Sequence, residues 1–156
     1  MSEPEELGRL LSERNETIAV AETTSGGLIC ARIVSVPGSS AYFDRGVVAY
    51  SKVSKIESLG VEACELDRFG AVSPETAGLL ATAVRDLAKT TYGLAETGIA
   101  GPIQGRSPKP IGTVYVGLAG PKGTEQLALQ FDGLREDIQA GIADEAIAFA
   151  VRCLKG

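Results

Sequence analysis

Short β-prone runs alternate with helical patterns along this chain, and that alternation limits the possible folds more than any other feature. Residues 17–21, 42–50 and 94–97 have the composition of strands, and between them apolar residues recur three and four positions apart, which is the spacing of one helix face. Residues 113–119 and 125–131 follow as a predicted antiparallel hairpin around a Gly-Pro-Lys-Gly turn. We therefore expect an α/β fold with three layers, α/β/α, and a mixed sheet.

Five segments have the patterns of helices: residues 7–11, 28–34, 52–59, 77–88 and 138–153. The fourth follows Ser73 and Pro74, a capping hydroxyl and a proline at the first helical position. We expect this helix to end at Gly93. Because the run 47–49 is apolar throughout, the strand over residues 42–50 is predicted to be central and covered on both faces.

Size and charge exclude several classes of protein. A chain of 156 residues fits one compact domain, so we predict a single domain over residues 1–156. Its 15 basic and 20 acidic side chains give a net charge of −5, which argues against a nucleic-acid partner. No apolar stretch approaches the roughly 20 residues that span a bilayer, so no membrane partner is expected.

The rare residue types narrow the chemistry further. The cysteines Cys30, Cys64 and Cys153 are odd in number and form no CxxC pair, which disfavours disulfides and zinc sites. We expect Cys30 and Cys153 to be small buried thiols and the setting to be reducing and cytoplasmic. The chain has no histidine, which removes the commonest general base and every His-bearing zinc site. We predict no metal and no cofactor, and any catalysis would use Lys, Tyr, hydroxyls, thiols, carboxylates or backbone amides.

Residues 22–27, with the sequence ETTSGG, place three hydroxyls beside two glycines where a strand gives way to a helix. Free backbone N–H groups and the positive end of the helix dipole favour an anion there, either a phosphate or a developing oxyanion. The glycines allow another group to approach the backbone closely. An ordinary helix cap in a tight turn explains the same residues equally well, so both interpretations stay open.

Residues 97–113 form a second unusual segment, with four glycines and three prolines between two predicted strands. The segment exceeds the usual connection of about 4–6 residues, and Arg106 and Lys109 make it basic in an acidic protein. A binding loop is the favoured interpretation, and a surface insertion is the alternative. Neither this segment nor the earlier one matches a Walker A loop or a GxGxxG fingerprint.

Tyr50 ends a predicted strand and precedes Lys55 by five residues, so both side chains can face one site across a turn. A desolvated lysine has a lowered pKa and can act as a neutral general base. That solution suits a chain without histidine. Ordinary solvated surface positions are the alternative for both residues.

These segments occur together in an order that resembles one family. The sequence is similar to the CinA C-terminal family (competence/damage-inducible protein CinA), which includes stand-alone nicotinamide mononucleotide deamidases. The resemblance runs from about Leu7 to the final helix. It rests on six ordered blocks: AETTSGG from Ala21, VPGSSAYF from Val36, GVVAYS from Gly46 with Lys55, GAVS from Gly70, TGIAGP from Thr97 and KPIGTV from Lys109.

The resemblance implies a metal-independent amidohydrolase. Members of the family hydrolyse the carboxamide of nicotinamide mononucleotide to give nicotinate mononucleotide and ammonia, in pyridine-nucleotide salvage. By position, the family's serine nucleophile falls on Thr23. The resemblance gives Lys55 the role of taking the proton of Thr23, and Tyr50 the role of orienting or relaying it.

The resemblance also implies a binding surface for a small nucleotide, and a homo-oligomer. Amide groups around residues 25–27 would form the oxyanion hole, the 97–105 loop would hold phosphate and ribose, and Arg135 would bind the phosphate. The implied binding residues are Thr24, Ser25, Gly26, Gly27, Thr97, Gly98, Ala100, Gly101, Gly105 and Arg135.

The chain departs from the family motif AESCTGG at three positions. Thr23, Thr24 and Ser25 stand where the family has serine, cysteine and threonine, and Gln104 stands where the family loop usually has glycine. The extra methyl group of a threonine stiffens its side chain and crowds the path of attack. Two hypotheses follow: an amidase that uses Thr23, and a non-catalytic nucleotide-binding module of the same fold that has lost turnover.

Overall fold

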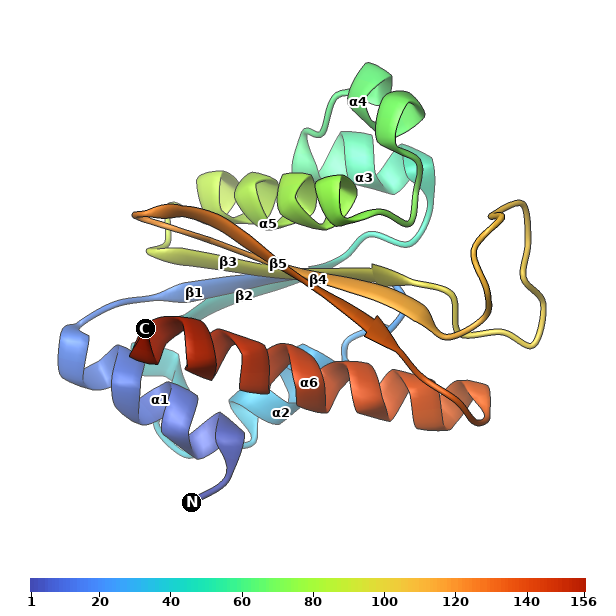
Figure 1. The fold of residues 1–156 in the computed structure, drawn as a ribbon. Helices are drawn as coiled ribbons and strands as arrows, with labels where there is room; N and C mark the ends of the chain where they lie inside the picture. The colour runs from blue at the N-terminus through green and yellow to red at the C-terminus, as the bar shows by residue number, and fades with distance from the viewer.

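The computed structural model describes all 156 residues, and it has the three-layer α/β/α architecture that the sequence predicts (Figure 1). Its strands are β1 (Ile18–Glu22), β2 (Phe43–Val48), β3 (Tyr92–Gly98), β4 (Thr113–Gly120) and β5 (Gly123–Gln130). Its α-helices are α1 (Glu3–Arg14), α2 (Leu28–Val34), α3 (Lys52–Leu59), α4 (Ala63–Phe69), α5 (Pro74–Ala88) and α6 (Arg135–Lys155). Helices α1, α2 and α6 lie on one side of the sheet, and α3, α4 and α5 lie on the other (Figure 1).

The five strands form one mixed sheet in the order β2-β1-β3-β4-β5. Strand β1 pairs in parallel with both β2 and β3, whereas β4 runs antiparallel to β3 and β5. The carboxyl ends of β1, β2 and β3 therefore meet at one edge, which is where open α/β sheets bind ligands. The register pairs Ala21 with Ala95, so Glu22 and Glu96 follow at the same level on neighbouring strands.

Alternation along the central strands divides the apolar core into two parts. Val20 and Leu94 pack toward α1, α2 and α6, where Ile142 is one of the fully buried residues. Ala21 and Ala95 pack on the opposite face, against α5, because successive side chains of a strand point to opposite faces. The smaller alanines let α5 lie close to the sheet. None of the helices combines the length and the apolarity needed to cross a membrane.

Hydroxyl caps begin two of the three helices that lie between β2 and β3 in the chain, α3 and α5. The side chain of Ser51 accepts a hydrogen bond from the Ser54 amide (3.0 Å) at the start of α3. The side chain of Ser73 accepts one from the Thr76 amide (3.1 Å) at the start of α5, as the Ser-Pro signal predicts. The first cap fixes where α3 begins, and Lys55 lies in its first turns as a buried residue.

Strand β2 corrects the prediction of a central strand. It lies at the edge of the sheet beside β1, and Asp44, Arg45 and Val48 are exposed. Charged side chains are typical of edge strands, where they oppose pairing with another chain. These charged residues indicate an edge strand, and they are a stronger signal of strand position than the short apolar run at residues 47–49. Strand β1, whose five residues are all buried, is the middle strand of the parallel part.

Two helix predictions also need correction. Helix α5 ends at Ala88, with Lys89 in the left-handed conformation at its C-cap (φ 58°), and not at Gly93. Gly93 belongs to β3, and α5 packs so closely there that a Cβ atom would collide with the carbonyl of Ala81. The glycine therefore marks a close approach of helix and sheet. Helix α4 was not predicted, because Leu66 is the one buried residue among its seven and a single apolar contact defines no repeating helix face.

The cysteines are free, as expected, but they are less buried than predicted. Cys30 and Cys153 are half-buried, and Cys64 is exposed. Burial raises the pKa of the Cys153 thiol to about 12, and its sulfur lies 3.2 Å from a carboxylate oxygen of Glu125. Burial also raises the pKa of the Cys30 thiol. A thiol that stays protonated is a poor nucleophile, so neither residue is a candidate for catalysis.

Candidate active site

A cavity of about 330 Å³ lies at the edge where the three parallel strands end. We call it the strand-end cavity. Segments that follow β1, β2 and β3 each contribute to its wall, together with the start of α6. The predicted residues in this wall are Thr23, Thr24, Tyr50, Lys55, Thr97, Gly98, Ala100, Gly101 and Arg135. The parallel topology thus brings together residues that are 74 positions apart in the chain, such as Thr24 and Gly98.

Four predicted residues do not line the cavity: Ser25, Gly26, Gly27 and Gly105. The Ser25 amide donates to a carboxylate oxygen of Glu96 (3.1 Å). The Gly26 amide donates to the Thr23 carbonyl (3.3 Å). The Gly27 amide donates to a carboxylate oxygen of Glu22 (3.1 Å). The predicted oxyanion hole at residues 25–27 is therefore corrected, because these N–H groups already have acceptors. The two adjacent glycines have positive φ (61° and 109°), so they shape the turn.

Glu22 caps the amino end of α2 from within the protein. It is fully buried, and its Oε1 accepts hydrogen bonds from Ser25 Oγ (2.5 Å), the Gly27 amide (3.1 Å) and the Ile29 amide (3.0 Å). Its Oε2 accepts from the Cys30 amide (2.9 Å). A carboxylate is favourable at the positive end of a helix. The anion expected beside this turn is therefore the carboxylate of Glu22 itself. The helix-cap interpretation thus describes the part of residues 22–27 that leads into α2.

Thr23 lies just beyond the end of β1, with its hydroxyl in the cavity wall and only 5% of the residue exposed. Its Oγ1 donates to the main-chain carbonyl of Glu96 (2.9 Å) and lies 3.3 Å from Oε1 of the same residue. Its amide donates to that Oε1 (2.6 Å). The neighbouring Thr24 hydroxyl donates to the Gly98 carbonyl (3.0 Å). The two threonines therefore tie the end of β1 to the end of β3.

Glu96 is a buried residue that the sequence analysis missed. It is 0% exposed, and its Oε1 accepts from the amides of Thr23 and Ser25 (2.6 and 3.1 Å). Its Oε2 is buried and has no hydrogen-bond partner. Burial raises the pKa of this carboxyl group above its ordinary value, although the two amides oppose the shift. The available signal was a carboxylate inside the apolar strand pattern at residues 94–97, where burial in an α/β sheet is the norm.

Lys55 reaches the cavity from α3 and is only 5% exposed. Its Nζ donates to the main-chain carbonyl of Tyr50 (3.0 Å). Burial lowers the pKa of this amine, and the charge of Glu96 partly opposes that shift. No hydrogen bond joins Lys55 to Thr23. The lysine is therefore a desolvated amine in the same cavity as the threonine hydroxyl, without direct contact between them.

The outer wall of the cavity is basic. The hydroxyl of Tyr50, a residue that is 64% exposed, accepts a hydrogen bond from Arg135 Nη2 (3.1 Å). Arg135 Nη1 donates to the Gly101 carbonyl (2.8 Å), which ties α6 to the loop after β3. Arg106 also lines the cavity, and no carboxylate forms a salt bridge with either arginine. Guanidinium groups without a carboxylate partner suit a phosphate.

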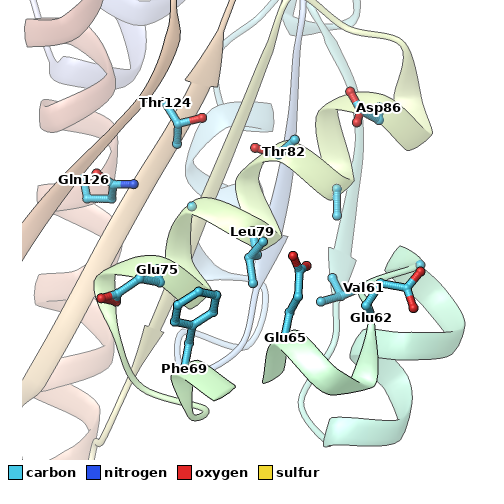
Figure 2. A pocket seen from close by; sticks show the side chains of 13 residues that line it. Val61, Glu62, Glu65, Phe69, Glu75, Leu79, Thr82, Asp86, Thr124 and Gln126 are labelled. Atoms are coloured by element: carbon cyan, nitrogen blue, oxygen red, sulfur yellow. The ribbon is translucent and has the colours of Figure 1, made fainter. Parts of the chain in front are cut away.

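A second hollow has the opposite charge (Figure 2). We call it the acidic hollow. It lies between α4, α5 and β5, and Glu62, Glu65, Glu75 and Asp86 are part of its wall, which contains neither lysine nor arginine. These carboxylates would repel an anionic ligand. The strand-end cavity is therefore the better candidate for an active site.

The family model described as the CinA C-terminal domain matches residues 2–154. The chain belongs to the CinA C-terminal domain family. A CinA-like protein of a Cyanothece species is 48% identical over 129 residues, which are 83% of this chain and 31% of the relative. A CinA-like protein of Endomicrobium trichonymphae is 46% identical over 140 residues, which are 90% of this chain and 33% of the relative. The chain thus spans about a third of the length of these curated relatives.

Solved structures support the same assignment. The competence or damage-inducible protein from Enterobacter asburiae has a TM-score of 0.93 and 27% sequence identity, over 97% of this chain and 96% of that one. The competence/damage inducible protein CihA from Agrobacterium tumefaciens has a TM-score of 0.89 and 31% identity, over 100% of this chain and 98% of that one. The family and the α/β fold predicted from the sequence are confirmed.

Proposed function

We propose that this CinA-family chain is an amidohydrolase that converts nicotinamide mononucleotide to nicotinate mononucleotide and ammonia. Family membership supports an enzyme of this kind. The observation that carries the proposal is the presence of the Thr23 hydroxyl and the desolvated amine of Lys55 in the wall of one cavity. A buried amine with a lowered pKa is one of the few general bases available to a protein without histidine.

The proposed reaction has two stages. Thr23 Oγ1 loses its proton, with Lys55 as the final acceptor, and attacks the carbonyl carbon of the carboxamide. The C–N bond then breaks, the amide nitrogen takes the proton held by Lys55 and leaves as ammonia, and the acyl group remains on Thr23 as an ester. Water attacks this ester, returns the proton to Oγ1 and releases the nicotinate product. No redox partner is needed for either stage.

Stabilisation of the oxyanion is assigned to the amide of Thr24. This N–H makes no hydrogen bond within the protein, and it follows the proposed nucleophile directly. The residue after the nucleophile supplies such a donor in other hydrolases. A single donor of this type contributes on the order of 100- to 1000-fold to the rate.

Arg135 and Arg106 are proposed to bind the phosphate at the mouth of the cavity, and Tyr50 to orient Arg135 through their hydrogen bond. Thr97, Gly98, Ala100 and Gly101 are proposed to surround the ribose. Gly105 lies outside the wall and has no proposed contact. The cytoplasmic setting and the homo-oligomer stay predictions. Sedimentation velocity would test the oligomer.

One observation favours the second candidate function, a nucleotide-binding module without turnover. The Thr23 hydroxyl donates to the Glu96 carbonyl and makes no hydrogen bond with Lys55. An alcohol held in this way needs a further group to remove its proton. If none acts, the cavity would bind nicotinamide mononucleotide without cleaving it.

Replacement of Thr23 by serine separates the two candidate functions. The assay measures ammonia and nicotinate mononucleotide from nicotinamide mononucleotide, for the wild-type chain and for Thr23→Ser. We expect clear wild-type turnover, and a change of no more than about tenfold in the variant, because serine keeps the hydroxyl. Thr82→Ser, in the acidic hollow, is the matched control. Activity that appears only in Thr23→Ser would favour the binding module.

A further inference from the structure

The loop between β3 and β4 is held mainly by side chains. It runs outward from the end of β3 and returns to β4 (Figure 1). Residues 100–109 make no hydrogen bond of normal length and angle between main-chain groups, and a segment without such bonds opens at a low cost in free energy. Residues 104–109, which we call the basic turn, contain Arg106 and Lys109. The contacts that fix this turn must therefore come from side chains.

The side chain of Gln104 closes the basic turn. Its Nε2 donates to the main-chain carbonyls of Ser107 (3.0 Å) and Lys109. An amide nitrogen has two N–H groups, so both are used within the turn. Gly105 follows with φ 71°, a left-handed conformation that suits glycine. Gln104 thus joins the start of the turn to its end.

Lys109 anchors the basic turn to the rest of the protein. Its Nζ donates to the main-chain carbonyl of Val72 and lies 5.1 Å from the centre of the Tyr115 ring. Its amide donates to Ser107 Oγ (3.2 Å). Val72 lies in the wall of the strand-end cavity, whereas Lys109 does not. The amine of Lys109 is therefore used in an internal contact, and Arg106 is the cation of the turn that lines the cavity.

We propose that Gln104 is a positioning residue that holds Arg106 at the cavity, and that it thereby makes the site selective for ligands with a terminal phosphate. The inference rests on the proposed function only in taking a nucleotide with one phosphate as the ligand. A guanidinium group binds phosphate through paired hydrogen bonds, which need a fixed orientation. The apparent Kd rises as the fraction of protein with the competent conformation falls. A glycine, which the family loop usually has at position 104, could make neither bond of the Gln104 side chain.

Arg135, the second arginine of the cavity wall, is positioned by other contacts. Its Nη1 donates to the Gly101 carbonyl (2.8 Å), and its Nη2 donates to the Tyr50 hydroxyl (3.1 Å). Neither acceptor belongs to the basic turn. Loss of the Gln104 side chain should therefore affect Arg106 and leave Arg135 in place.

The first test compares two ligands by calorimetry in a Thr23→Ala background, so that turnover does not interfere. The ligands are nicotinamide mononucleotide and nicotinamide riboside, which lacks the phosphate. We expect Gln104→Ala to weaken binding of the nucleotide about tenfold and to change binding of the riboside less than twofold. Gln126→Ala, in the acidic hollow, is the matched control. Equal weakening of both ligands, or no change in either, would overturn the proposal.

A double-mutant cycle identifies the group through which Gln104 acts. If it acts through Arg106, Gln104→Ala should weaken binding of the nucleotide less than twofold once Arg106→Gln is present. In the Arg135→Gln background the full loss of about tenfold should remain, because that arginine is positioned independently. A full loss in the Arg106→Gln background would overturn the proposal.

Limited proteolysis tests the basic turn without any nucleotide. Trypsin cleaves after arginine, and a loosened loop is a preferred site of cleavage. We expect the bond between Arg106 and Ser107 to be cut at least about tenfold faster in Gln104→Ala than in the wild type or Gln126→Ala, with an unchanged melting temperature. Equal rates would overturn the positioning role. Faster cleavage in Gln104→Ala, with no binding of nicotinamide mononucleotide in the Thr23→Ala background, would reject the proposed ligand and keep the role of Gln104.

Discussion

The ends of β1 and β3 carry two buried carboxylates that differ in how their oxygens are satisfied. Glu22 ends β1, and both of its oxygens accept hydrogen bonds, from a hydroxyl and three amides of the turn and of α2. Glu96 stands one strand away at the same level, and its Oε2 has no partner. The two residues share Ser25 Oγ as a neighbour, at 2.5 and 3.1 Å.

This difference distinguishes a structural role from a chemical role for a buried carboxyl group. A carboxylate with all acceptors filled stabilises the fold and has no capacity left for a reaction. A carboxyl group with one oxygen free keeps an uncompensated cost, and such costs gather at functional sites. The hydrogen bonds of Glu22 therefore give the end of β1 a structural role, except for the Thr23 hydroxyl, whereas the end of β3 keeps a buried oxygen that no structural contact uses.

The largest expected effect comes from removing the hydroxyl that faces Glu96. Thr23→Ala should lower kcat by at least about 10⁴-fold, because loss of a nucleophile removes the covalent route. The measurement is ammonia release from nicotinamide mononucleotide, with Thr82→Ala in the acidic hollow as control. A loss below about tenfold in Thr23→Ala would assign the end of β1 to structure alone.

The second-largest expected effect is a difference in thermal stability between variants of Glu22 and of Glu96. Glu22→Gln places an amide where Cys30 donates and weakens the cap of α2, so we expect a loss of about 2 kcal/mol and a melting temperature lower by about 4–8 °C. Glu96→Gln puts its amide where nothing donates and should not lower the melting temperature. Thermal unfolding of both variants tests the contrast. Equal destabilisation would show that the two residues have the same structural role.

A smaller effect is expected for Arg135 at the mouth of the strand-end cavity, because Arg135 hydrogen-bonds neither the Glu22 nor the Glu96 side chain. Arg135→Gln should raise KM about tenfold to 100-fold, because a charge-assisted contact contributes about 1.5–3 kcal/mol, and leave kcat within about threefold. Steady-state kinetics separate the two parameters. Lys122→Gln, far from this cavity in the turn between β4 and β5, is the control. A fall in kcat with constant KM would instead link Arg135 to the proton path.

The smallest expected effect is a pH dependence of stability. Burial raises the pKa of Glu96 in the folded protein above the unfolded value of about 4.3. Its contribution to stability is therefore complete below pH 4.3 and is lost as the pH rises through the folded pKa. Relative to Glu96→Gln, the wild-type free energy of unfolding should fall as the pH rises above about 4.3. Urea unfolding of both chains at several pH values measures it, and a constant difference would contradict a buried, titrating Glu96.

The sequence predicts the layers and most elements because their periodicity and caps are local signals. The Ser73-Pro74 start of α5 is correct, and the 113–131 hairpin forms as expected. The errors arise where tertiary contacts decide. Gly93 is explained by a helix that packs on β3, and the exposed Val48 by the place of β2 at the sheet edge.

The candidate site likewise contains some residues that local sequence signals identify and others whose roles depend on tertiary contacts. Thr23 and Lys55 were singled out from the sequence, and the topology brings them to one cavity. The amides of residues 25–27 were expected to be free, and only the structure assigns their acceptors. Glu96 was missed because its role depends on β3 lying beside β1, a pairing that no local pattern reports.

The most direct test of the account is a measurement of ammonia and nicotinate mononucleotide from nicotinamide mononucleotide, run for the wild-type chain and for Lys55→Ala. We predict that the wild type releases the two products in equal amounts, and that Lys55→Ala reduces the rate at least 100-fold. Binding of the nucleotide without release of either product by the wild type would contradict the account.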